Sequence, residues 1–117
     1  MDEKQALAAF GALSQDTRLR IVRLLVQAGP EGLAAGAVGE AAGVSASNVS
    51  FHLKELERAG LVNARRQARS ITYAADYAAL AGLLQFLMED CCDGRPEICA
   101  PALASSCSPR PSEAADV

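Results

Sequence analysis

The feature that most constrains this chain is a change of hydrophobic period at Gly60. Residues 45–60, "SASNVSFHLKELERAG", place apolar side chains at helical spacing, with Ser45 as a candidate N-cap and Gly60 as a stop. Residues 61–75, "LVNARRQARSITYAA", instead hold short β-prone runs around a charged segment. The pattern therefore predicts an amphipathic helix that leads directly into a β-hairpin with a basic tip.

The segment before that helix completes a helix-turn-helix pattern. Residues 33–45, "LAAGAVGEAAGVS", predict a short helix that is followed by Gly43 and then by the cap at Ser45. In the hairpin, strands are expected at Leu61–Ala64 and Ser70–Ala74, with "RRQAR" between them. Two helices joined by a glycine turn and followed by a hairpin predict a winged helix-turn-helix.

Three further helical segments flank this region, at residues 3–13, 14–29 and 76–92. In the second, Ser14 is the expected cap and Gly29-Pro30 the stop. Its expected buried stripe comprises Leu19, Val22, Leu25 and Val26. The fold class that follows is α+β and mostly helical, with about five helices and a two-stranded hairpin wing.

The last helix carries an apolar stripe that its own chain is too short to cover. The stripe comprises Tyr77, Leu80, Leu84, Leu87 and Cys91. Because an amphipathic helix needs a partner for its apolar face, we expect a second subunit to cover it, which makes the protein a homodimer. We divide the chain into a DNA-binding and dimerisation domain at residues 1–92 and a cysteine-containing tail at residues 93–117, which is rich in Ala, Ser and Pro after Cys99 and expected to be disordered.

The composition favours a cytoplasmic protein with no membrane partner. No apolar run of the 117-residue chain reaches the length of a membrane span, and the chain does not begin with a signal-peptide pattern. Thiols stay reduced in the cytoplasm, so the four cysteines indicate metal or redox chemistry before a disulfide framework.

The charge of the chain is uneven in a way that favours nucleic acid. The formal net charge is −3, yet residues 45–70 hold five basic and two acidic side chains, a local charge of +3. A local basic patch on a helix-turn-helix indicates double-stranded DNA as the partner.

On a helical wheel, the second helix of the pair separates a core face from an exposed face. Val49, Leu53 and Leu56 lie on the core face; His52 flanks it and is expected to be packed or bonded to backbone rather than to bind a ligand. The alternative for the exposed face is an ordinary solvated surface, but the basic hairpin favours DNA contact. The expected DNA-binding residues are Ser45, Ser47, Asn48, Ser50, Phe51, Lys54, Arg65, Arg66 and Arg69.

Three stretches give the chain a family resemblance. "LSQDTRLRIVRLL" at 13–25, "SASNVSFHLKELERAGLV" at 45–62 and "RRQARSITY" at 65–73 resemble the ArsR/SmtB family of bacterial metal-responsive repressors. The resemblance covers about residues 5–90. It implies a winged-helix homodimer whose first and last helices form the interface, which needs no cofactor to bind operator DNA and which releases that DNA when a ligand binds.

The chain departs from the family pattern at three places. The helix before the recognition helix, "GAVGEAAG", lacks the Cys-x-Cys pair of the best-known arsenic sensors. Asp76 and Glu89 on the last helix have no histidine beside them, so the family's zinc site is not matched. The wing tip has Ala68 where the family usually has glycine. Ligand chemistry is therefore expected in "MEDCCDGRPEIC", residues 88–99.

Cys91, Cys92 and Cys99 suit a thiophilic trivalent ion, and the tail resembles that of family members with a vicinal cysteine pair plus a third cysteine. Three thiolates and arsenic(III) sum to zero charge, which removes the penalty for packing the complex against apolar surface. Adjacent residues of a regular helix point about 100° apart, so the pair can bind one ion only where the helix ends, before Gly94. The expected inducer is As(III), or Sb(III).

Other readings of the cysteines remain open at this point. Soft thiolates also bind zinc, cadmium or lead, and Cys107 would supply a fourth sulfur. The same cysteines could instead sense oxidants or sulfide. A thiol enzyme such as an arsenate reductase would need an oxyanion-binding loop, which we do not find, so we expect no enzyme. A DNA-binding protein without any ligand is the last alternative.

Overall fold

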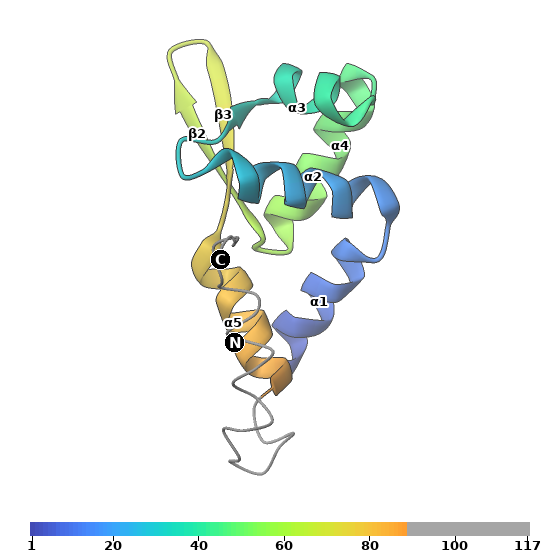
Figure 1. The fold of residues 1–117 in the computed structure, drawn as a ribbon, viewed down its shortest axis with the longest axis vertical. Coiled ribbons are helices and arrows are strands. Elements are labelled where there is room, and N and C mark those ends of the chain that lie inside the picture. The colour runs from blue at the N-terminus through green and yellow to red at the C-terminus, as the bar shows by residue number, and fades with distance from the viewer. Residues whose placement is uncertain (89–117) are drawn as a thin grey trace, which may run out of the picture. The chain divides into compact units, whose positions relative to one another are not determined.

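The computed structural model describes residues 1–88, and residues 89–117 lie outside the described part. Five helices and three strands follow one another along the chain (Figure 1). The elements are α1 (Glu3–Leu13), α2 (Asp16–Ala28), β1 (Leu33–Ala34), α3 (Ala35–Ala42), α4 (Ala46–Arg58), β2 (Val62–Gln67), β3 (Ser70–Ala75) and α5 (Tyr77–Met88). The predicted winged helix-turn-helix with five helices and a hairpin is confirmed.

The boundary between α1 and α2 differs from the prediction by one residue. Ser14 is the C-cap of α1, and Gln15 is the N-cap of α2, where its side chain accepts a hydrogen bond from the Arg18 amide. The prediction that Ser14 caps α2 is wrong because its hydroxyl instead donates to the Gly11 carbonyl of the preceding turn. The predicted stop is confirmed, because Gly29 is the C-cap of α2.

The buried stripe of α2 is also rotated relative to the prediction. Ile21, Val22 and Leu25 are buried, whereas Leu19 is 48% exposed and Val26 is exposed as well. Ile21 takes the place of Leu19, because α2 packs against both α3 and β3 and so turns a different arc toward the core. The prediction of Leu19 and Val26 as buried residues is therefore wrong.

The wing belongs to a three-stranded antiparallel sheet with the order β1-β3-β2. The predicted helix at 33–45 begins only at Ala35, because Leu33 and Ala34 pair with Tyr73 and Thr72 of β3. This pairing requires glycine at position 32, where φ is +75° and an added Cβ would lie 2.8 Å from the Tyr73 carbonyl carbon. The short strand β1 was missed because two residues carry no detectable periodicity.

The hairpin is longer and its turn tighter than predicted. Val62 pairs with Ala75 at the base and Gln67 pairs with Ser70 at the tip, so only Ala68 and Arg69 form the turn. The predicted strand ends at Ala64 and Ala74 are therefore wrong. Ala68 has a φ of +56°, in the left-handed region that glycine adopts more readily than alanine. Alanine at this position of the turn therefore has a backbone penalty that the family's usual glycine would avoid.

The core of the compact unit Met1–Leu83 lies between the helices and the inner face of the sheet. Its largest fully buried side chains come from α2, α3, α4 and the start of the wing. These residues are Ile21, Leu25, Val38, Val49, Leu53, Leu56, Leu61 and Val62. Within residues 1–88, Tyr73 is the only buried residue whose side chain carries a polar group, its hydroxyl, so the core is held mainly by apolar packing.

The helix α5 starts in the first unit and ends in the second, which runs from Leu84. Asp76 caps the helix, since its carboxylate accepts from the Ala79 amide at 2.9 Å. The predicted helix end at residue 92, the disorder of the tail and the arrangement of Cys91, Cys92, Cys99 and Cys107 lie outside the described residues. No helix of the described part is long and apolar enough to span a membrane.

Candidate nucleic-acid interface

The turn between α3 and α4 is fixed by two glycines. Gly43 ends α3 with a φ of +72°, and the Val44 amide donates back to the Gly39 carbonyl at 2.8 Å. Gly39 is buried, and a Cβ at that position would lie 3.0 Å from the Val44 carbonyl oxygen. The two helices thus approach closely, and the tight turn sets the direction in which α4 leaves the core.

Helix α4 begins at a polar cap and presents two different faces. Ser45 is the N-cap, and its hydroxyl accepts from the Asn48 amide at 3.4 Å. The side facing the molecule is apolar and fully covered by the core, as the wheel predicted. The exposed side comprises Ser47, Asn48, Ser50, Phe51 and Lys54, all of which are exposed.

The polar side chains of this exposed face have no partner inside the described part of the chain. Ser47, Ser50 and Lys54 form no hydrogen bond or ion pair with residues 1–88. Their donors and acceptors are therefore directed at solvent, where they are available to a ligand. Two hydroxyls and one ammonium on consecutive turns of a helix suit phosphate oxygens and base edges.

Phe51 and His52 form an aromatic pair at the middle of α4. Their ring centroids lie 5.5 Å apart with an interplanar angle of 65°, an edge-to-face contact. His52 is half-buried, and its Nδ1 is buried without a hydrogen-bond partner. His52 is therefore packed, as predicted, but it forms no backbone bond through Nδ1. Phe51 remains 57% exposed.

The three wing arginines do not occupy equivalent places. Arg65 and Arg66 lie in β2 and not in the turn, so alternation directs their side chains to opposite faces of the hairpin. The Arg65 guanidinium donates from Nη2 to the carbonyls of Pro30 at 3.1 Å and Glu31 at 2.9 Å. Arg66 and Arg69 form no such bonds within residues 1–88, and Arg69 lies in the turn itself.

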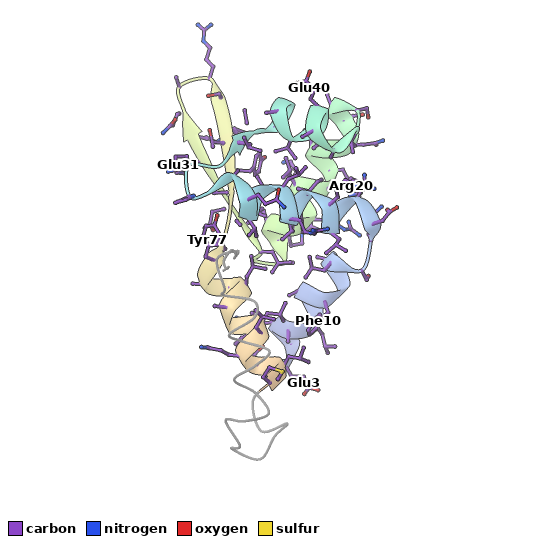
Figure 2. All side chains as sticks on the ribbon, in the orientation of Figure 1. Glu3, Phe10, Arg20, Glu31, Glu40 and Tyr77 are labelled. Carbon is purple, nitrogen blue, oxygen red and sulfur yellow. The ribbon has the colours of Figure 1, made fainter. Side chains whose placement is uncertain are left out.

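Arg65 thus links the wing to the loop that follows α2 through hydrogen bonds. A second hydrogen bond links the same end of α2 to α5, because the hydroxyl of Tyr77 (labelled in Figure 2) donates to the Val26 carbonyl at 3.0 Å. Neither role was expected from the sequence, since exposed arginine and tyrosine side chains carry no signal for a distant carbonyl partner.

Another contact that the sequence did not indicate holds the first helix of the pair. The Arg20 guanidinium on α2 donates to the Ala42 carbonyl at the end of α3, over 3.2 Å. A cation at a helix C-terminus satisfies an unpaired carbonyl and complements the helix dipole. Arg20 is therefore a positioning residue for the helix-turn-helix rather than a free cation for DNA.

The electrostatics of the exposed surface are basic once internal pairs are considered. Arg58 forms an ion pair with Glu55 at 3.0 Å, so these two charges of α4 largely cancel. Arg65 is held by carbonyls, which leaves Lys54, Arg66 and Arg69 as unpaired cations of α4 and the wing in the described part. These three cations mark the surface on which an anionic duplex would lie.

The predicted metal ligands Cys91, Cys92 and Cys99 lie outside the described residues. Within residues 1–88, no group of three or more His, Cys, Asp or Glu side chains is placed to hold a metal ion. The site residues assigned to DNA are all described, and the structure brings those of α4 together on one exposed face.

Comparison with known proteins places the chain among transcriptional regulators. The family described as a helix-turn-helix domain matches residues 13–65. An uncharacterized HTH-type transcriptional regulator, YceK of Bacillus subtilis (strain 168), is 38% identical over 69 residues, which cover 59% of this chain and 68% of that protein. The HTH-type transcriptional regulator YgaV of Escherichia coli (strain K12) is 33% identical over 89 residues, or 76% of this chain and 88% of that protein.

Solved structures agree with these relatives. A solution structure from Mycobacterium bovis contains the homodimeric winged helix-turn-helix DNA-binding domain of a possible ArsR-family transcriptional regulator. It is similar to this chain with a TM-score of 0.59 and 29% identity, over 79% of this chain and 85% of that one. The chain therefore belongs to the ArsR/SmtB-like family of winged helix-turn-helix transcriptional regulators.

Proposed function

We propose that this protein is a repressor that binds operator DNA as a homodimer, with α4 in the major groove and the wing against the DNA backbone or the minor groove. The observation that carries the proposal is the exposed face of α4. Its side chains have no partner in the described part of the chain, and its opposite side is buried in the core. The N-terminal residues of such a helix contact base edges in the helix-turn-helix docking geometry.

Apolar residues at the two ends of the described chain support a homodimer. On α1, Leu7 is 66% exposed and Phe10 is exposed as well (Figure 2). On α5, Leu84 and Leu87 are exposed. Large apolar side chains that remain exposed on helices favour association, and a related domain from Mycobacterium bovis is homodimeric. A dimer would read two half-sites about one helical turn apart.

Binding to the protein's own promoter region tests this function. Fluorescence anisotropy over a salt series should give a steep decrease in affinity with salt, since phosphate contacts release counterions. Arg66→Ala and Lys54→Ala should each reduce the slope by about one per lost contact, and so by about two in a dimer. Arg23→Ala is the matched control, because Arg23 is an exposed cation on α2, outside the proposed surface. Equal slopes for all variants would contradict the assigned surface.

We further propose that trivalent arsenic is the inducer and that Cys91, Cys92 and Cys99 bind it. The chemistry of the donor set supports this assignment: three soft thiolates neutralise a trivalent thiophilic ion, and the chain offers three cysteines within nine residues. In sequence, Cys91 lies four residues after Leu87, the last exposed residue of the α5 stripe. Ligand binding there would alter the dimer interface and hence the spacing of the two α4 helices. The ligand would act because it binds the DNA-binding conformation and the DNA-releasing conformation with different affinities.

Serine variants of the cysteines separate this proposal from its alternatives. Cys91→Ser, Cys92→Ser and Cys99→Ser should each leave promoter binding unchanged and abolish release by arsenite, while Cys107→Ser should leave both unchanged. Mass spectrometry of the intact protein should show added metalloid mass after arsenite. Loss of two hydrogens after mild peroxide, with no response to arsenite, would instead favour a redox sensor. Release by cadmium, lead or zinc but not by arsenite would mean that the inducer is one of these metal ions instead of arsenic.

A further inference from the structure

The ring of Phe51 is an apolar group at the centre of a polar face. Its helical neighbours on that face are Ser47, Ser50 and Lys54. All other large apolar side chains of α4 are buried, whereas Phe51 is 57% exposed. Because more than half of this ring is exposed, burying the rest of it under a ligand that covers this face would be favourable.

The structure holds this ring in a defined orientation before any ligand binds. The edge-to-face contact with His52, at 5.5 Å between centroids, restricts the rotation of the Phe51 side chain. His52 is half-buried, with its Nδ1 in the interior, and so gives the pair a fixed base. A pre-ordered aromatic group loses little conformational entropy on binding.

The position of Phe51 along α4 corresponds to base edges rather than to phosphates. Helix α4 begins at Ala46, so Phe51 lies roughly 7.5 Å along it, in the second turn. Ser47 and Ser50 lie on the N-terminal side and Lys54 lies one turn beyond. The polar groups around the ring suit phosphates and base-edge donors or acceptors, while the ring itself has no hydrogen-bonding group.

Only one base offers an apolar group in the major groove, and that base is thymine with its 5-methyl group. We infer that Phe51 is a specificity-determining residue that reads the 5-methyl group of one thymine in each operator half-site. The cations Lys54, Arg66 and Arg69, which have no partner in residues 1–88, favour DNA over a protein as the molecule that covers this ring. The inference rests on the proposed function, because it requires α4 to lie in the major groove.

Replacement of single thymines by deoxyuridine tests the inference, since it removes one methyl group and keeps every base-pair hydrogen bond. In a footprinted promoter fragment, each thymine of both half-sites is replaced in turn and the affinity is measured by anisotropy. We expect one position per half-site at which wild-type affinity falls about 4-fold, the factor that corresponds to about 0.8 kcal/mol for one buried methyl group. Replacement in both half-sites should lower it about 15-fold if the two are independent.

Variants of Phe51 link the effect to the ring. Phe51→Ala should bind thymine and deoxyuridine promoters equally, and Phe51→Leu should retain part of the discrimination. Val26→Ala is the matched control, because Val26 is also an exposed apolar residue but lies on α2; it should discriminate as the wild type does. Thermal unfolding by circular dichroism verifies that each variant is folded.

The outcomes separate this inference from the function on which it rests. Tight, salt-dependent promoter binding without any deoxyuridine-sensitive position would overturn the role of Phe51 and leave the repressor intact. The same follows if Phe51→Ala keeps the full discrimination. Failure of the wild-type protein to bind its promoter at all would overturn the proposed function, and the inference with it.

Discussion

Substitution of Gly32 by alanine tests how the wing is attached to the helices. A Cβ at Gly32 would meet the Tyr73 carbonyl oxygen, and it would lie 3.1 Å from the Ala74 Cβ. The φ of +75° adds a backbone penalty of about 1 kcal/mol for alanine. Forcing atoms into a packed site adds about 2 kcal/mol more, so we expect a loss of about 3 kcal/mol in the free energy of unfolding.

Two other glycines separate these contributions. Gly43 has a φ of +72°, but nothing lies within 4 Å of its added Cβ, so Gly43→Ala should lose only about 1 kcal/mol. Gly36 lies in α3 with open space around it, and Gly36→Ala should gain about 0.5 kcal/mol. From most to least stable, the expected order is therefore Gly36→Ala, Gly43→Ala and Gly32→Ala. Backbone conformation alone would make Gly43→Ala and Gly32→Ala equally unstable.

Urea unfolding followed by circular dichroism at 222 nm measures the three differences. All variants should be compared at one protomer concentration and in reducing buffer, because dimerisation makes stability depend on concentration. With a slope of about 2 kcal/mol/M, Gly32→Ala should lower the midpoint by about 1.5 M. If Gly32→Ala lost no more than Gly43→Ala, strand β1 would move away from β3 without penalty, and the sheet would not be a rigid link to the wing.

Three further substitutions test the turn of the wing and the hydrogen bonds of Tyr77 and Arg65. Ala68→Gly should raise the free energy of unfolding by up to about 1 kcal/mol in urea titrations, because it relieves the left-handed φ of the turn. Tyr77→Phe should lower it by about 1 kcal/mol, the net value of the hydroxyl bond to the Val26 carbonyl, and calorimetry should show the lower melting temperature. Arg65→Ala should lower the free energy of unfolding, because Arg65 is bonded to the Glu31 carbonyl. It should change the salt slope of promoter binding less than Arg66→Ala does. Equal changes in slope would contradict the structural role of Arg65.

The sequence was sufficient for those elements whose pattern is long and strongly periodic. Helix α4 has a buried face of Val49, Leu53 and Leu56, and this face and the exposed one followed from helical spacing alone. The hairpin followed from the change of period after Gly60. In both cases local propensity and tertiary packing favour the same structure.

Other features depend on tertiary contacts that the sequence does not encode locally. Strand β1 exists because Leu33 and Ala34 pair with β3, forty residues away in the chain. The stripe of α2 includes Ile21 instead of Leu19 because α1, α3, α4 and β3 all pack on the helix. The bonds from Arg65 to the loop carbonyls were not indicated by the sequence, because strand alternation and the fold bring this side chain to a distant loop; contact of Arg65 and Arg66 with DNA stays a prediction.

The most direct test of the whole account is promoter anisotropy with the purified, reduced, full-length protein before and after arsenite is added. We expect tight, salt-dependent binding that arsenite reverses at low micromolar concentration in the wild type, while zinc has no effect. Cys91→Ser should bind the same DNA and not release it when arsenite is added. Binding that ignores every metal and metalloid would contradict the arsenic sensor, and an absence of promoter binding would contradict the repressor itself.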